Sequence, residues 1–139
     1  MSTIEIIENK ISYIRQQMAF AEQFKRYSYE DILKNPMLKG ALERNLYIIA
    51  QAVIDLAEAL VAFKNFRKPT TMRDAFDILQ EEGVLGREFV ENFVKIVGFR
   101  NAIAHDYQKL DFKKVYDVLQ EKLPQVEQFL EYIKKYLRL

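Results

Sequence analysis

Apolar side chains recur at helical spacing from the start of the chain. Between residues 4 and 24 they fall at every third or fourth position, at Ile4, Ile7, Ile11, Ile14, Met18, Ala21 and Phe24. A second apolar row adds Ile6, Tyr13, Phe20 and Tyr27. This pattern predicts a long helix that is buried on a wide face and is also suited to pairing with another surface.

A second long helix is predicted to begin at Asn35-Pro36 and to run to about Phe63. Asparagine is a favourable cap, and proline fits the first helical position. Apolar residues surround most of this helix, but Arg44, Gln51, Asp55 and Glu58 form one polar stripe within ~40° of one another. The stripe either faces water, or Arg44, Gln51 and Asp55 orient functional side chains elsewhere in the fold.

The remaining pattern is also helical. Ser28 with its following acids predicts a short helical turn, and Thr71 to Asp74 resembles a capping box that opens a short helix ending near Gly83. Apolar residues from Phe89 to Val97 predict a fourth long helix that runs into residues 98–107. Gly98 inside it suggests the close approach of a backbone or ligand.

The last helix is predicted to start at the cap Asp111, with an apolar row that continues to Leu137 and a bend at Pro124. The sequence contains neither strand-like alternation of any length nor an internal repeat or linker. We therefore expect an all-α fold: a single domain over residues 1–139, built as an antiparallel bundle of about four long helices plus short helical turns.

Composition limits the functional classes. The 139 residues are 50% hydrophobic and 29% charged, with a net charge of +1, which excludes a disordered chain and a broad polycationic coat for nucleic acid. The absence of cysteine excludes disulfides, thiol nucleophiles and zinc–thiolate sites. Without a signal peptide or an unbroken apolar run of ~20 residues, we expect a soluble, cytoplasmic protein with no membrane association.

The decapeptide Gly98–Tyr107 carries the candidate chemistry because it holds the single histidine of the chain. Asn101 and His105 are four residues apart and share a helix face, and Arg100 lies beside them. A guanidinium, an amide and an imidazole together are suited to a phosphate. Arginine binds two phosphate oxygens, histidine transfers a proton, and asparagine orients the nucleophile or the imidazole. Alternatively, a histidine near a helix C-terminus merely caps carbonyl groups.

These residues resemble a known family. Arg100-Asn101-Ala102-Ile103-Ala104-His105 looks like the signature of HEPN domains, and the extension to Tyr107 resembles the HepT toxin subgroup, as does the stretch from Leu42 through Asp55. The resemblance implies a metal-independent endoribonuclease toxin of a type VII HEPN/MNT toxin–antitoxin pair, whose partner is an MNT-type nucleotidyltransferase antitoxin. It implies catalytic roles for Arg100, Asn101 and His105, and adenylylation at Tyr107; alternatively, the Tyr107 ring only packs.

Metal-free RNA cleavage requires a base, an acid and a cation around one phosphate. Because the chain has one histidine, two imidazoles require two chains, so we expect a homodimer with a composite Arg/His site. Two basic groups could guide RNA: Lys109 with Lys113 and Lys114, and Lys64 with Arg67, Lys68 and Arg73. Such a group is more often an ordinary solvated face than a track for phosphates.

Other chemistries lack their motifs. The sequence has neither a glycine-rich phosphate loop nor a metal-ligand histidine pair nor a nucleophile elbow, so we expect no metal and no cofactor. The alternative function is a non-catalytic helical module that binds a nucleotide or a protein through the same pocket.

Overall fold

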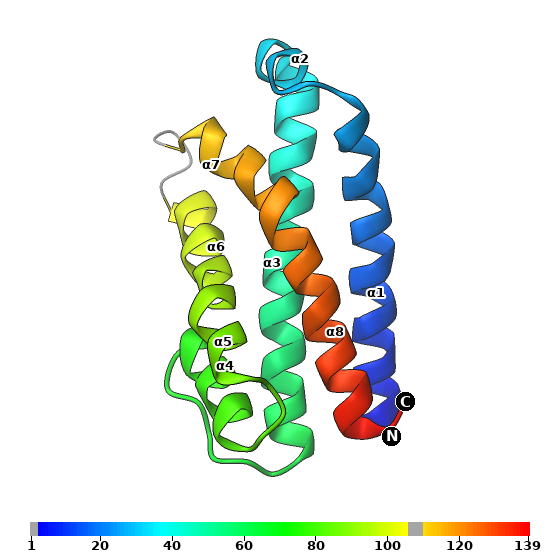
Figure 1. Ribbon diagram of the computed structural model, residues 1–139, viewed down its shortest axis with the longest axis vertical. Coiled ribbons are helices and arrows are strands. Elements are labelled where there is room, and N and C mark those ends of the chain that lie inside the picture. The colour runs from blue at the N-terminus through cyan, green and yellow to red at the C-terminus, as the bar shows by residue number, and fades with distance from the viewer. Residues whose placement is uncertain (1–2, 106–109) are drawn as a thin grey trace.

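The computed structural model describes residues 3–105 and 110–139, and it is all-α, as expected. The elements are α1 (Thr3–Gln23), the 3₁₀ turn η1 (Phe24–Arg26), α2 (Tyr29–Lys34), α3 (Pro36–Phe63), α4 (Met72–Glu81), α5 (Arg87–Phe93), α6 (Lys95–His105), α7 (Phe112–Asp117), the π-helical turn η3 (Val118–Lys122) and α8 (Leu123–Leu137). The two chain ends lie at the same end of the bundle (Figure 1).

Helix α3 is the centre of the bundle. It contacts α1, α2, α4 and α6, and Figure 1 shows it flanked by α1 and α6 with α8 crossing in front. Among the described residues α3 alone is long and apolar enough to cross a membrane, but more than half of its most apolar window is buried inside the bundle. The central position therefore accounts for apolar residues around most of its circumference.

Local capping sets the helix starts that the sequence predicts. The Asn35 side chain accepts hydrogen bonds from the amides of Met37 and Leu38, and Ser28 forms a full capping box with Asp31. Asp111 caps α7 in the same way. These side chains satisfy amides that have no partner within the helix, so the boundaries follow from local chemistry.

The Thr71 prediction is only half correct. Thr71 Oγ1 accepts from the Asp74 amide, but the Asp74 carboxylate accepts from Thr70 and from Arg67 instead of closing the box. The hydrogen bonds from Arg67 and Thr70 lower the pKa of Asp74 to about 2. Arg67 also bonds Glu81. Arg67 therefore fastens the α3–α4 loop to α4, which removes it from the basic group proposed to guide RNA.

The fourth long helix is wrong as one element, because it breaks at Val94 into α5 and α6. The Val97 amide bonds the Val94 carbonyl three residues back, so one tight turn redirects the chain. The expected close approach of a backbone at Gly98 is also wrong: a Cβ built there meets no heavy atom within 4 Å in the described structure.

Pro124 acts through a wider helical turn. The π-helical turn η3 ends two residues before this proline, between α7 and α8. A proline ring collides with the carbonyl four residues earlier and offers no amide, and a wider turn accommodates both defects. The last helix consequently continues past Pro124, with Phe129, Leu130 and Ile133 fully buried.

Candidate functional site

Arg100 lies across the contact between α6 and α3. Its Nε donates to Gln51 Oε1 at 2.6 Å, and Gln51 Nε2 donates to Asp55 Oδ1 at 2.9 Å. All three side chains are half-buried. One member of the polar stripe, Gln51, thus positions Arg100, and a second, Asp55, fixes the amide of Gln51 at the far end of this Arg100–Gln51–Asp55 relay.

Asn101 completes the local support of Arg100. Arg100 Nη1 donates to Asn101 Oδ1 at 3.0 Å, so the two neighbours of the motif are joined directly. Together with the bond to Gln51, this uses two of the five guanidinium donors. The other donors have no hydrogen-bond partner within residues 3–105 and 110–139, and the planar fork of a guanidinium suits two oxygens of one phosphate.

Tyr47 is a site residue that the sequence argument missed. The guanidinium carbon of Arg100 lies 5.8 Å from the centre of the Tyr47 ring, and that of Arg44 lies 5.7 Å from it. Arg44 therefore reaches the site through this ring, without a bond to the relay. The sequence spacing could have indicated this residue. One face of α3 carries, at four-residue steps, Tyr47, Gln51 and Asp55.

His105 is the last residue of α6 and its side chain is exposed. It lies one helical turn after Asn101, at the C-terminal end of α6. The imidazole does not point into an apolar interior. Tyr107 and Lys109 lie outside the described residues.

A pocket of about 400 Å³ adjoins the motif helix. It is lined by Gly40, Glu43, Arg44 and Tyr47 of α3 and by Ile103 and Ala104, which directly precede His105. The pocket thus joins the arginine pair on Tyr47 to the end of α6. A chain that brings a half-buried guanidinium, an exposed imidazole and a hollow into one region can bind a phosphodiester and transfer a proton.

Comparisons with known proteins agree with this geometry. The family profile described as "Ribonuclease HepT-like" matches residues 14–133. The chain is 31% identical to the mRNA nuclease HepT of Shewanella oneidensis over 131 residues, covering 94% of this chain and 97% of that protein. It is 27% identical to the tRNA nuclease HepT of Aphanizomenon flos-aquae over 139 residues, covering 99% and 95%.

A solved structure gives the same relationship. The tri-AMPylated HEPN toxin of Shewanella oneidensis, in complex with an MNT antitoxin, superposes with a TM-score of 0.86 at 30% identity, covering 97% of this chain and 99% of that one. The likeness therefore extends over the whole bundle.

The hydrogen bond from Arg100 to Gln51 can be tested by substitution. Replacing Gln51 by leucine removes the acceptor of Arg100 Nε–H, so this proton should exchange faster with solvent in ¹⁵N NMR spectra. Unfolding free energy should fall by about 1–3 kcal/mol, the usual cost for a hydrogen bond to a charged group. Gln51→Glu keeps an acceptor and should keep the slow exchange.

Glu58→Leu is the matched control, because Glu58 is an exposed member of the same stripe. Equal exchange rates in wild type and Gln51→Leu would show that the amide does not hold Arg100 in solution.

Proposed function

Because this chain belongs to the HepT-like ribonuclease family, we propose that it is the ribonuclease toxin of a toxin–antitoxin pair. The observation that carries the proposal is the placement of Arg100, fixed by Gln51 and Asn101, five residues before the exposed His105. The nuclease names of its relatives and the toxin–antitoxin complex formed by its structural neighbour support the same function.

The proposed reaction uses the RNA's own 2′-hydroxyl and no metal. A neutral imidazole takes the hydroxyl proton while the oxygen attacks phosphorus; the P–O5′ bond breaks and the leaving oxygen takes a proton from an imidazolium. The products are a cyclic phosphate and a free 5′-hydroxyl. Arg100 stabilises the charge that develops on the phosphorane oxygens, and Asn101 keeps its fork in place.

One histidine per chain makes this a reaction of two chains. We infer a two-fold homodimer in which both motifs face one phosphate. The surface next to the relay supports such a contact: a groove of about 420 Å³ between α1 and α3 is lined by Ile6 and Tyr13 and ends at Asp55. Tyr13 is 44% exposed, and a large aromatic ring in that position suits burial against a second copy.

The proposed partner is an MNT-type nucleotidyltransferase antitoxin that adenylylates Tyr107. A phosphate anion two residues after His105 would compete with RNA for the imidazole and for Arg100. The AMPylated state of the Shewanella oneidensis HEPN toxin supports this form of control.

Loss of His105 tests the activity. Expression without the partner should arrest growth, and His105→Ala should abolish both arrest and RNA cleavage while the helical spectrum and the oligomeric mass stay unchanged. The cleaved RNA ends should carry cyclic phosphates. An arrest that persists in His105→Ala would favour the alternative, a helical module that acts by binding alone.

Mixed dimers test whether the site is composite. When wild type and His105→Ala chains are coexpressed in equal amounts and exchange freely, about one quarter of the dimers carry two histidines. We therefore expect about one quarter of the activity measured for the same total number of chains when all of them are wild type. An activity of about one half would mean that each chain cleaves with its own imidazole.

Tyrosine modification has its own measurement. After incubation with the nucleotidyltransferase and ATP, intact-mass and peptide spectra should show adenylyl groups on Tyr107 and cleavage should stop. The Tyr107→Phe chain should stay unmodified and remain toxic beside its partner. Spectra that show no adenylyl group on wild-type Tyr107 would remove this proposal and leave the nuclease assignment standing.

A further inference from the structure

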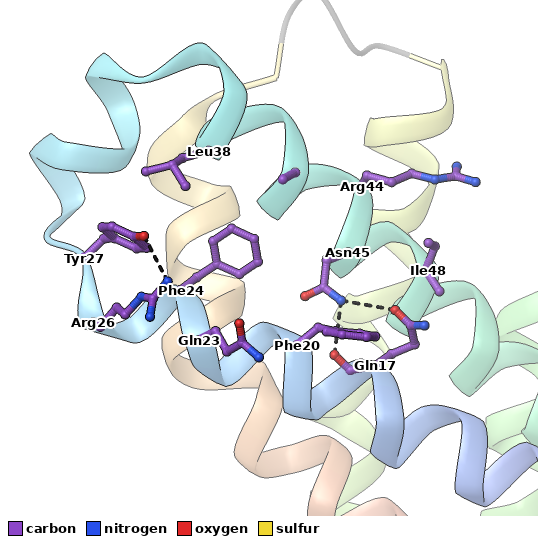
Figure 2. Close-up of a pocket in the computed structure, with 11 residues that line it drawn as sticks. Gln17, Phe20, Gln23, Phe24, Arg26, Tyr27, Leu38, Arg44, Asn45 and Ile48 are labelled. Atoms are coloured by element: carbon purple, nitrogen blue, oxygen red, sulfur yellow. Dashed lines mark hydrogen bonds between the residues drawn. The ribbon is translucent and has the colours of Figure 1, made fainter.

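A second hollow, which we call the α1–α3 pocket, lies at the opposite end of the α1–α3 contact from Asp55. Figure 2 shows it between the C-terminal part of α1, η1 and the first half of α3. Its volume is about 480 Å³, and its lining is Gln17, Phe20, Gln23, Phe24, Arg26, Tyr27, Leu38, Ala41, Arg44, Asn45 and Ile48. The lining thus mixes aromatic rings, side-chain amides and arginines.

Asn45 gives this pocket an unused acceptor. Its side chain is more than nine-tenths buried, and Nδ2 donates to the backbone oxygen of Gln17 at 3.1 Å and to Gln17 Oε1 at 3.3 Å. Because both acceptors belong to Gln17, a flipped amide would place oxygen against oxygen. Asn45 Oδ1 therefore points away from Gln17 (Figure 2), and it is buried without a partner in the described structure.

A buried carbonyl without a hydrogen-bond partner is unfavourable, and a ligand N–H that bonds it would remove this cost. Because the oxygen is buried, a donor reaches it only when side chains around it rotate aside. The pocket consequently favours a ligand that carries an N–H donor on an otherwise flat, apolar body.

Aromatic rings supply the surface for such a body. Phe20 is 48% exposed and lies beside Asn45 in Figure 2, while Phe24 and Tyr27 are half-buried further along the pocket. A large ring that remains half in water gains most by stacking on another planar group. Nucleobases stack on phenylalanine in this way and present N–H groups at their edges.

The charge of the lining matches a polyanion. Arg26 and Arg44 are both exposed, and no carboxylate is present among the described residues that line the pocket. Arg26 is held over the Tyr27 ring at 5.0 Å, with its Nη2 donating to the Tyr27 hydroxyl at 3.1 Å. Two cations at the edges of an aromatic hollow suit the phosphates on either side of a bound base.

The position along α3 connects this pocket to the motif. Arg44 lines both the α1–α3 pocket and the pocket beside Ala104. Asn45 precedes Gln51, the acceptor of Arg100, by six residues, or ~9 Å along a helix axis. One RNA strand can therefore lie with a phosphate at Arg100, cross Arg44 and insert a neighbouring base beside Phe20.

We propose that the α1–α3 pocket binds an unstacked base of the RNA substrate, stacked on Phe20 and donating to Asn45 Oδ1. This assignment rests on the ribonuclease function proposed above. Adenine, cytosine and guanine offer an exocyclic amino group, whereas the only ring N–H of uracil that can face the acceptor is flanked by two carbonyls. The pocket thus prefers a base with an amino group.

Binding of uncleaved RNA tests the proposal. In the His105→Ala chain, fluorescence anisotropy is measured with short fluorescein-labelled RNAs made only of adenine or only of uracil. Adenine RNA should bind more tightly, Phe20→Ala should weaken its binding about ten-fold, and Phe20→Tyr should restore it. Tyr136→Ala is the matched control, since Tyr136 is an aromatic residue of 37% exposure on α8 and outside this pocket.

Asn45→Leu should remove the preference for adenine while binding to uracil RNA stays unchanged. If that buried substitution unfolds the chain, Phe20→Ala still decides the question. Unchanged adenine binding in Phe20→Ala overturns the proposal. So does a weaker binding that coincides with loss of the dimer in mass measurements, because the pocket would then be a contact between copies.

Cleavage of RNA by the wild-type chain is recorded in parallel. A chain that binds adenine RNA through Phe20 but cuts none would overturn the nuclease proposal and keep the binding site. A chain that cuts RNA, and whose binding of adenine RNA is unchanged in Phe20→Ala, would keep the nuclease proposal and overturn the binding site.

Discussion

The structure depends on placing one guanidinium in the half-buried contact between α3 and α6 without neutralising it. Arg100 bonds a neutral amide, Gln51, and the carboxylate of Asp55 acts only through that amide. A carboxylate in direct contact would form an ion pair and weaken the attraction for a phosphate. The amide satisfies the donor while it leaves the positive charge for a ligand, which explains why a polar stripe interrupts an otherwise apolar α3.

The aromatic core fixes the helix that presents this guanidinium. Phe93, the last residue of α5, packs against Phe76 of α4 and Phe129 of α8 with ring centres 5.7 Å and 5.1 Å apart. All three rings are fully buried, so the end of α5 is anchored from two sides. The tight turn at Val94 then sets the direction of α6, and with it the register of Arg100 opposite Gln51. A side chain on such a rigid element, here the proposed catalytic Arg100, keeps its orientation before a substrate arrives.

Local chemistry made most of the fold predictable from the sequence. Each of three residues caps the helix that the sequence predicts directly after it: Ser28, Asn35 and Asp111. This is predictable because capping depends only on the next three residues. The break at Val94 has no such marker: neither glycine nor proline is there, and the apolar row continues through it, with Phe93 and Ile96 both buried at helical spacing. The sequence pattern therefore could not place this boundary.

Part of the site could likewise be predicted from the sequence and part could not. The spacing of Arg100, Asn101 and His105 indicated the motif, and the polar stripe indicated Gln51 and Asp55 as the residues that support it. Tyr47 was hidden because an aromatic residue in an apolar helix is expected to be core, and only the structure shows two arginines on its ring. The unsatisfied oxygen of Asn45 was equally invisible, since hydrogen-bond satisfaction is a property of the folded arrangement.

In the proposed dimer, symmetry creates a chemical problem that the imidazoles solve. Two identical histidines face one phosphate, yet cleavage needs one as base and one as acid. Imidazole is the side chain whose neutral and protonated forms are both populated near neutral pH. Because two imidazolium cations in close contact repel each other, a pair that carries one proton is favoured over a pair that carries two. In that dimer the exposure of His105 would let the imidazoles exchange protons with water between turnovers. The RNA, which lacks two-fold symmetry, then determines which copy acts as the acid.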